Sequence, residues 1–211
     1  MSAPIEPEPA DELEIRAVAA ERLTFFSDAV VAIAMTLLAL DLPVPKGDTS
    51  AEFWHSALSH REDYLAFLIG FLVIGAHWRG HHRVFRYVTS VTPRLTSWNM
   101  AWLLMLVVTP FATRVIAGDS YFPARFTMYA GVQILAGLSF QAMLFEIKRN
   151  GLLRSTAPMD KVAASRFRSA AIALAWVVGI PLSYVTGWAY LVLVVVPIAG
   201  NTVGRRLHGP D

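Results

Sequence analysis

The chain contains no cysteine among its 211 residues. That absence excludes a disulfide bond, a thiolate nucleophile and a cysteine-ligated metal site. Charged residues are also scarce, at 16% of the chain, whereas average soluble domains have about 25%. In their place, 55% of the residues are hydrophobic and the mean hydropathy is +0.47. Because apolar runs of about 20 residues recur along the whole length, the composition predicts an all-α, multi-span membrane protein rather than a soluble domain with one anchor.

The beginning of the chain lacks the charged-then-apolar pattern of a signal peptide, because its first residues are polar and acidic. Residues 1–10 alternate proline with glutamate, and this composition predicts disorder. Asp11 is a suitable N-cap for a short helix that can run straight into the first membrane span. We expect a cytoplasmic N-terminal tail with this short helix, a six-helix transmembrane domain and a cytoplasmic C-terminal tail, over residues 1–21, 22–205 and 206–211.

Six apolar segments are predicted to span the membrane, and they cover residues 23–42, 62–79, 95–116, 123–146, 167–185 and 188–204. An even number of spans places both termini on one side of the bilayer. Basic residues gather after the second, fourth and sixth segments, and the positive-inside rule makes that side cytoplasmic. We therefore expect a multi-pass protein of the inner (plasma) membrane with both termini in the cytoplasm.

The first apolar segment carries a charge where a plain anchor carries none. Asp28 lies more than a turn inside it, and a carboxylate at that depth costs about 2.5–3.5 kcal/mol unless it finds partners. Arg22 stands at the start of the same segment. Candidate partners at a similar depth end the second segment and begin the third, and they are His77, Arg79, His81, His82, Trp98, Asn99 and Trp102. We expect a buried polar cluster that ties the first three segments together.

A branched aliphatic stripe follows a different face of the first segment. At about 100° per residue, the i, i+4, i+7 spacing aligns Ile33, Leu37 and Leu40. Asp28 lies about 140° around the helix from Ile33. The side chains next to the stripe are Phe26, Val30 and Thr36. Such stripes usually face lipid or pack against other helices, so the periodicity alone does not assign a pore.

Other chemistries fit the same polar residues less well. Ser27, Asp28 and a histidine at 81 or 82 contain the elements of a nucleophilic triad, but the serine and aspartate point to different sides and no GxSxG motif is present. A metal site at His81 and His82 is disfavoured because adjacent helical histidines diverge by about 100°. A proton-coupled secondary transporter that uses Asp28 and the histidines of the second span remains an alternative, as does a non-conducting membrane scaffold.

Several short motifs resemble those of one family of channels. Arg22-x-x-x-Phe26-Ser27-Asp28, followed by Ala-Ile-Ala-Met-Thr-Leu-Leu, is similar to the first-helix signature of the transmembrane protein 175 potassium channels. Further matches are Trp78-x-x-His81-His82-x-x-Phe85, Asn99 and Pro110-Phe111. The resemblance covers about residues 20–115. It implies a homotetramer in the lipid bilayer, in which four copies of the first helix surround the conduction path.

The resemblance also implies roles for individual residues. Ile33 would form the narrowest apolar ring, with Leu37 and Leu40 on its outer side, and Thr36 would be the polar position that contributes to selectivity. Potassium in the pore would pass Ile33 and Thr36. The supporting polar network would contain Arg22, Phe26, Ser27, Asp28, His77, Trp78, His81 and Asn99. No TVGYG-like segment is present, so the expected preference for potassium over sodium is moderate. The implied protein is not an enzyme, has no cofactor beyond permeant potassium and has no nucleic-acid partner.

Overall fold

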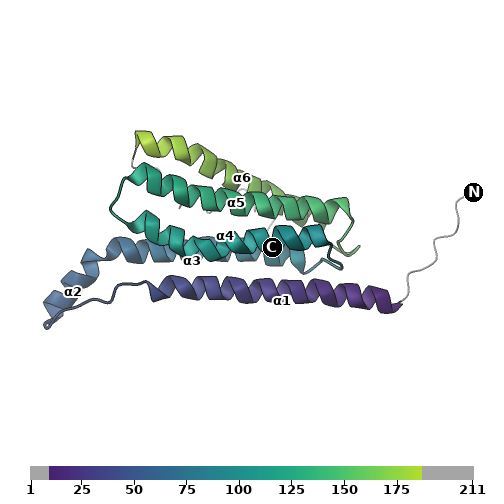
Figure 1. Cartoon of the computed structure of the whole chain (residues 1–211), viewed down its shortest axis with the longest axis horizontal. Helices are drawn as coiled ribbons and strands as arrows, with labels where there is room; N and C mark the ends of the chain where they lie inside the picture. The colour runs from purple at the N-terminus through teal and green to yellow at the C-terminus, as the bar shows by residue number, and fades with distance from the viewer. Residues whose placement is uncertain (1–9, 187–211) are drawn as a thin grey trace, which may run out of the picture.

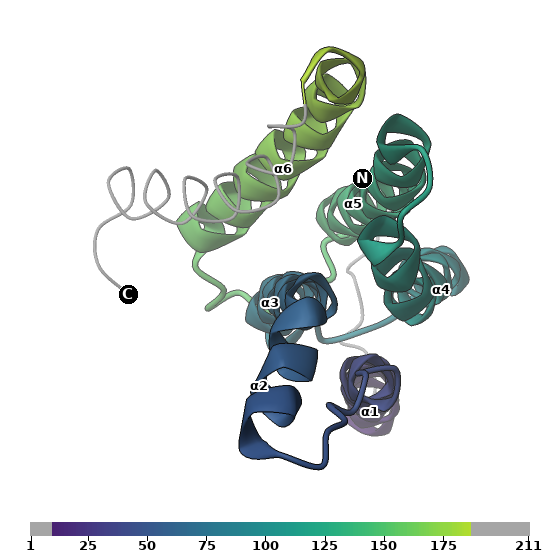
Figure 2. The ribbon, with the colours of Figure 1, turned by 90° about the vertical axis from the view of Figure 1, so that its left-hand side faces the viewer.

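The computed structural model describes residues 10–186, which form α-helices joined by short connections (Figure 1). The helices are α1 (Ala10–Leu40), α2 (Ser50–Ser59), α3 (Arg61–Phe85), α4 (Pro93–Ala117), α5 (Phe122–Arg149) and α6 (Met159–Val185). All except α2 run roughly alongside one another. In the end-on view of Figure 2, α1 lies beside α3 and α4, while α5 joins α4 to α6. The predicted all-α architecture is confirmed for this part of the chain.

Helices long and apolar enough to cross a membrane occur at four places in the described chain, namely Glu14–Leu40, Pro93–Ala117, Phe122–Arg149 and Val162–Val185. These agree with four of the predicted spans. The predicted second span lies in α3, which is not among them. Charged side chains at both ends of α3 leave an uncharged stretch only from Tyr64 to Trp78. The predicted sixth span, 188–204, lies outside the described residues.

Helix α1 is continuous over 31 residues. It begins at Ala10, and Asp11 and Glu12 in its first turn favour the positive end of the helix dipole. The short N-terminal helix and the first span are therefore one element, with no break between residues 21 and 22. Its end at Leu40 comes shortly before Pro43, which cannot continue a helix.

The connection that follows α1 contains the short helix α2, between the first two predicted spans. The Thr49 side chain accepts a hydrogen bond from the Glu52 backbone N–H at 3.3 Å, and the Glu52 carboxylate accepts one from the Asp48 N–H at 3.0 Å. Thr-x-x-Glu is the sequence signature of a helix start. This local signal could have indicated α2, which is not among the predicted elements.

Two buried clusters hold the bundle together. The first joins α1, α3, α4 and α5 and contains Ala34, Ile74 and Trp102, each of them fully buried. The second packs α6 onto α4 and α5 through Phe126 and Trp176, among others. Because α1 contributes only to the first cluster, it is packed on one side alone.

The connections at the basic end of the bundle bind each other. Val88, after α3, forms an isolated antiparallel bridge with Leu153, after α5. The buried Glu146 near the end of α5 accepts a hydrogen bond from the Thr92 hydroxyl at 3.0 Å. Thr92 is also the N-cap of α4. These contacts fix the ends of α3, α4 and α5 relative to one another.

Candidate functional site

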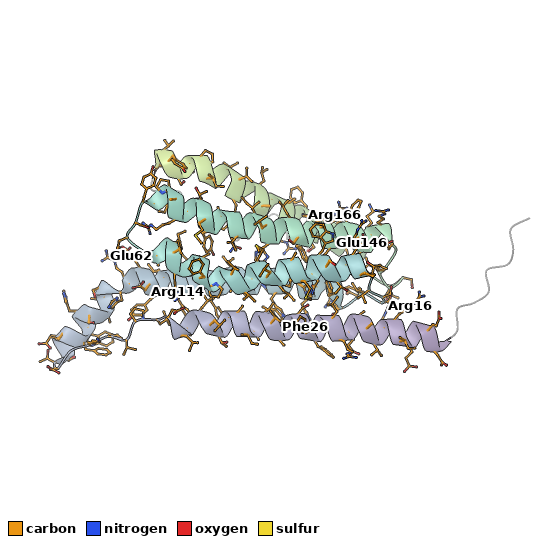
Figure 3. All side chains as sticks on the ribbon, viewed as in Figure 1. Arg16, Phe26, Glu62, Arg114, Glu146 and Arg166 are labelled. Carbon is orange, nitrogen blue, oxygen red and sulfur yellow. The ribbon has the colours of Figure 1, made fainter. Side chains whose placement is uncertain are left out.

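Helix α1 has one packed face and one free face in this chain. The packed face is almost fully buried and consists of Ser27, Val31, Ala34 and Leu38. The free face is apolar, with exposed fractions of 51%, 57%, 37% and 78% for Phe26, Ile33, Leu37 and Leu40. Figure 3 shows side chains projecting from this free edge of the bundle, where Phe26 is labelled. The structure thus places the predicted aliphatic stripe on the surface of the subunit.

The Thr36 hydroxyl lies on the free side of α1 and is exposed. It donates a hydrogen bond to the Ile33 carbonyl at 2.8 Å. Because its proton is used within the helix, the oxygen lone pairs remain free to face a cation or water. This is the polar group that accompanies the apolar stripe.

A chain of hydrogen bonds connects α1, α3 and α4 on the packed side. His81 Nε2 lies 3.0 Å from Asn99 Oδ1, and Asn99 Nδ2 donates to Ser27 Oγ at 2.9 Å. The Ser27 hydroxyl in turn donates to the Leu23 carbonyl at 2.8 Å. These directions require the proton of His81 on Nε2, because the amide oxygen of Asn99 only accepts. Nδ1 of His81 has no partner among the described residues.

Aromatic rings hold His81 in place. Its ring stacks on Phe85 with centroids 3.8 Å apart and on Trp102 with centroids 4.6 Å apart. The side chain is fully buried. A stacked, fully enclosed imidazole serves as a fixed hydrogen-bond donor for Asn99 rather than as a mobile ligand.

The partner of Asp28 is a tryptophan. Trp78 Nε1 donates a hydrogen bond to Asp28 Oδ1 at 2.9 Å, and the Trp78 ring stacks on His82. Neither His77 nor His81 contacts Asp28 through a hydrogen bond. Within residues 10–186, the Asp28 carboxylate is therefore bound by the indole of Trp78 and not by a histidine.

Three members of the expected network lie elsewhere. Arg22 is exposed and has no ion pair or side-chain hydrogen bond with the described chain. Phe26 lies on the free face of α1. His77 belongs to a second chain of polar groups, in which His77 Nε2 lies 3.1 Å from Gln133 Oε1 and Gln133 Nε2 lies 3.4 Å from Thr109 Oγ1. The structure thus separates His77 from the cluster around Asn99.

An ion pair that the sequence reading missed ties the end of α1 to α4. Arg114 Nη1 lies 3.0 Å from Asp41 Oδ1. The two residues are 73 positions apart, so no local pattern could have indicated the contact. Figure 3 labels Arg114 beside the end of α4. Asp41 therefore forms an ion pair within its own chain.

The packed face carries the contacts that position α1, and the free face carries none. No group of three His, Cys, Asp or Glu side chains that could hold a metal ion occurs between residues 10 and 186. The arrangement is that of a positioned transmembrane helix that presents an apolar face with one hydroxyl.

Together, the apolar helices describe a multi-pass membrane protein, in which α1 is fixed along one face and uncovered along the other. The family described as endosomal/lysosomal potassium channel TMEM175 matches residues 22–110. A potassium channel of Streptomyces collinus is 35% identical over 166 residues, which cover 75% of this chain and 81% of that protein. The chain therefore belongs to the TMEM175 channel family.

Further similarities support this assignment. The crystal structure of a lysosomal potassium-selective channel TMEM175 homologue from Chamaesiphon minutus has a TM-score of 0.74 and 26% identity, covering 89% of this chain and 98% of that one. The chicken endosomal/lysosomal proton channel TMEM175 is 30% identical over 134 residues, which are 60% of this chain and 26% of that protein. The names of these relatives describe ion channels, and none describes an enzyme.

Proposed function

We propose that the chain is the subunit of a cation channel with a moderate preference for potassium over sodium. Four copies surround a central pore lined by α1, and Ile33, Leu37 and Leu40 form its apolar gate. The observation that carries this proposal is the uncovered apolar face of α1, of which Ile33 is 57% exposed. The names of the bacterial relatives as potassium channels support the choice of ion.

Packing explains why α1 suits this position. Its opposite face is held by the Ser27–Asn99 and Asp28–Trp78 hydrogen bonds. These contacts fix the rotation of α1 about its own axis, so the side chains at 33, 37 and 40 keep a defined direction. Four copies related by a fourfold axis would cover this face, and the α1 helices would then surround that axis.

The chemistry of the free face determines the kind of selectivity that we propose. Rings of Ile33 and Leu37 offer no oxygen ligands, so the closed state excludes ions by dewetting. Opening widens the rings until a largely hydrated ion can pass. Potassium releases its water more readily than sodium, and the Thr36 oxygen supplies the little coordination that the pore offers. The preference for potassium is therefore moderate.

The membrane placement is part of the same proposal. α3 and the segment 188–204 complete six spans, and both termini lie in the cytoplasm of an inner-membrane protein. The basic connections after α3 and α5 support this orientation. For α3, local thinning of the bilayer and snorkelling of the flanking charged side chains make a short apolar stretch sufficient.

The test is the Ile33→Asn variant, reconstituted in liposomes. A polar ring at the narrowest point removes the dewetting barrier, so potassium flux should rise by about tenfold if the barrier falls by about 1.4 kcal/mol. The preference for potassium over sodium should fall. Leu174→Asn, at an exposed apolar position of α6, is the matched control and should change neither quantity. An Ile33→Asn variant with unchanged flux and selectivity would remove Ile33 from the gate.

A proton-coupled transporter is the alternative that the same assay tests. Its relay would need Asp28 to exchange protons with a histidine, yet Asp28 binds Trp78 and His81 binds Asn99. Because the chicken relative is named a proton channel, proton flux is measured in the same liposomes. Saturable potassium flux that follows an imposed pH gradient would favour the transporter.

A further inference from the structure

A cavity of about 270 Å³ lies between α3, α5 and α6. Figure 2 shows α6 diverging from α3, while α5 lies to the right of both. The cavity is separate from the free face of α1, because none of its lining residues belongs to α1. It also differs from the rest of the packed interior in that basic side chains line one end.

The basic end of the cavity carries guanidinium and hydroxyl groups. Arg79 and Arg83 come from successive turns of α3, and Arg168, Ser165 and Ser169 come from the start of α6. No lining residue is an aspartate or glutamate. Neither Arg79 nor Arg83 has an ion pair or a side-chain hydrogen bond with the described part of the chain. Their charges are therefore available to an external anion.

Beyond the His77–Gln133 pair, which also lines the cavity, the opposite end is mostly apolar. Leu72 and Ala76 precede the arginines on α3, while Ile172 and Trp176 follow the serines on α6. The two helices run in opposite directions, so their basic parts lie at one level and their apolar parts at another. The arginines of the cavity lie at the end of the bundle that also holds the basic connections after α3 and α5.

We propose that this cavity binds the phosphate group of an anionic membrane lipid, with an acyl chain along its apolar wall. Arginine donates paired hydrogen bonds that match phosphate oxygens, and basic pockets between transmembrane helices on the cytoplasmic side suit anionic headgroups. A free phosphate ion would use the arginines but would leave the apolar wall uncovered. The combination of both surfaces selects the lipid.

The location of the cavity links lipid binding to α1. Consecutive residues of α3 have different partners, since Trp78 donates to Asp28 of α1 and Arg79 lines the cavity. A headgroup that holds Arg79 and Arg83 against α6 therefore acts on the helix that positions α1. This effect on conduction rests on the proposed function, whereas the binding site does not.

The binding test uses the full-length protein in detergent and native mass spectrometry. Phosphatidylglycerol, phosphatidylcholine and inorganic phosphate are titrated separately. The wild-type protein should prefer phosphatidylglycerol over phosphatidylcholine, and the double variant Arg79→Gln/Arg83→Gln should lose at least about tenfold of that affinity. Arg94→Gln, at an exposed arginine outside the cavity, is the control and should retain the preference. Unfolding temperatures of both variants that match the wild-type value show that the variants are folded.

The outcomes separate the possible ligands. Equal retention of phosphatidylglycerol by the double variant and the Arg94 control would overturn the site. Binding of inorganic phosphate without any preference between the two lipids would overturn the lipid as its occupant. Lipid preference in a protein that conducts no ions would overturn the proposed function and leave the site intact. Normal flux without lipid preference would do the reverse.

Discussion

Asn99 is the residue on which the contact between α1, α3 and α4 depends. Its amide donates to Ser27 and its carbonyl oxygen lies within hydrogen-bond distance of His81. Both partners are fully buried, so bulk water cannot take the place of Asn99 as their hydrogen-bond partner. A buried polar group left without a partner costs about 1–3 kcal/mol, whereas a complete network stabilises one arrangement of the helices.

We therefore predict that Asn99→Ala destabilises the protein by about 2–4 kcal/mol, because it leaves two buried groups unpaired. Tetramer yield in detergent should fall before ion selectivity changes, since the residue is remote from the free face of α1. Thermal unfolding and size-exclusion chromatography measure both effects. Ser97→Ala is the matched control on the same helix, because Ser97 is exposed and bonds only its own helix. Equal stability of the two variants, or altered selectivity with normal assembly, would contradict the positioning role of Asn99.

At the scale of helices, α1, α3 and α4 meet at Gly70. A Cβ atom on Gly70 would lie 2.8 Å from Thr113 Oγ1 and 3.3 Å from Leu38 Cδ2. Thr113 cannot easily rotate away, because its hydroxyl donates to the Thr109 carbonyl at 2.9 Å. Leu38 belongs to the packed face of α1, directly after the proposed gate residue Leu37. The absence of a side chain at Gly70 therefore sets how near α1 and α4 approach α3.

Gly70→Ala should consequently cost about 1–3 kcal/mol of stability through overpacking. The comparison is Gly131→Ala in α5, where nothing lies within 4 Å of the added Cβ. That second substitution should be neutral or stabilising by up to about 1 kcal/mol, because alanine favours helix over glycine. Thermal unfolding in detergent reports both. A Gly70→Ala protein that is as stable as Gly131→Ala would show that α1, α3 and α4 can accommodate an added methyl group at this position.

The elements that the sequence predicts well are those with local signals. The apolar run and Pro43 predict the end of α1 within two residues. Thr-x-x-Glu at 49–52 is a local signal of the same kind, although α2 was not predicted from it. Side-chain partners depend instead on how helices rotate and slide against each other. For that reason the side chains that the sequence offers as partners of Asp28, such as His77 and His81, do not include its donor Trp78, which only the fold brings to the carboxylate. The pairing of His77 with Gln133 of α5 likewise depends on how the helices pack.

At the scale of the whole molecule, the chain by itself leaves the apolar face of α1 uncovered. The interior of the bundle is built from α3, α4 and α5, while α1 is attached at one edge (Figure 2). The motifs between Arg22 and Asn99 could indicate the family because they specify this attachment. They could not show whether copies assemble, because any contact between copies would lie outside one chain.

The absence of cysteine from the chain permits a direct test of that assembly. In a Leu37→Cys variant, each subunit carries one thiol, and thiols that face a shared axis can meet at the Cβ separation of about 3.8 Å that a disulfide requires. Oxidation in membranes should then convert the protein to disulfide-linked dimers on non-reducing gels, and a reductant should reverse the change. Leu174→Cys, on the exposed apolar side of α6, should stay monomeric on the same gels. Because lipid-facing positions meet only by random collision, equal cross-linking at 37 and 174 would mean that α1 faces lipid and that the cation path lies elsewhere.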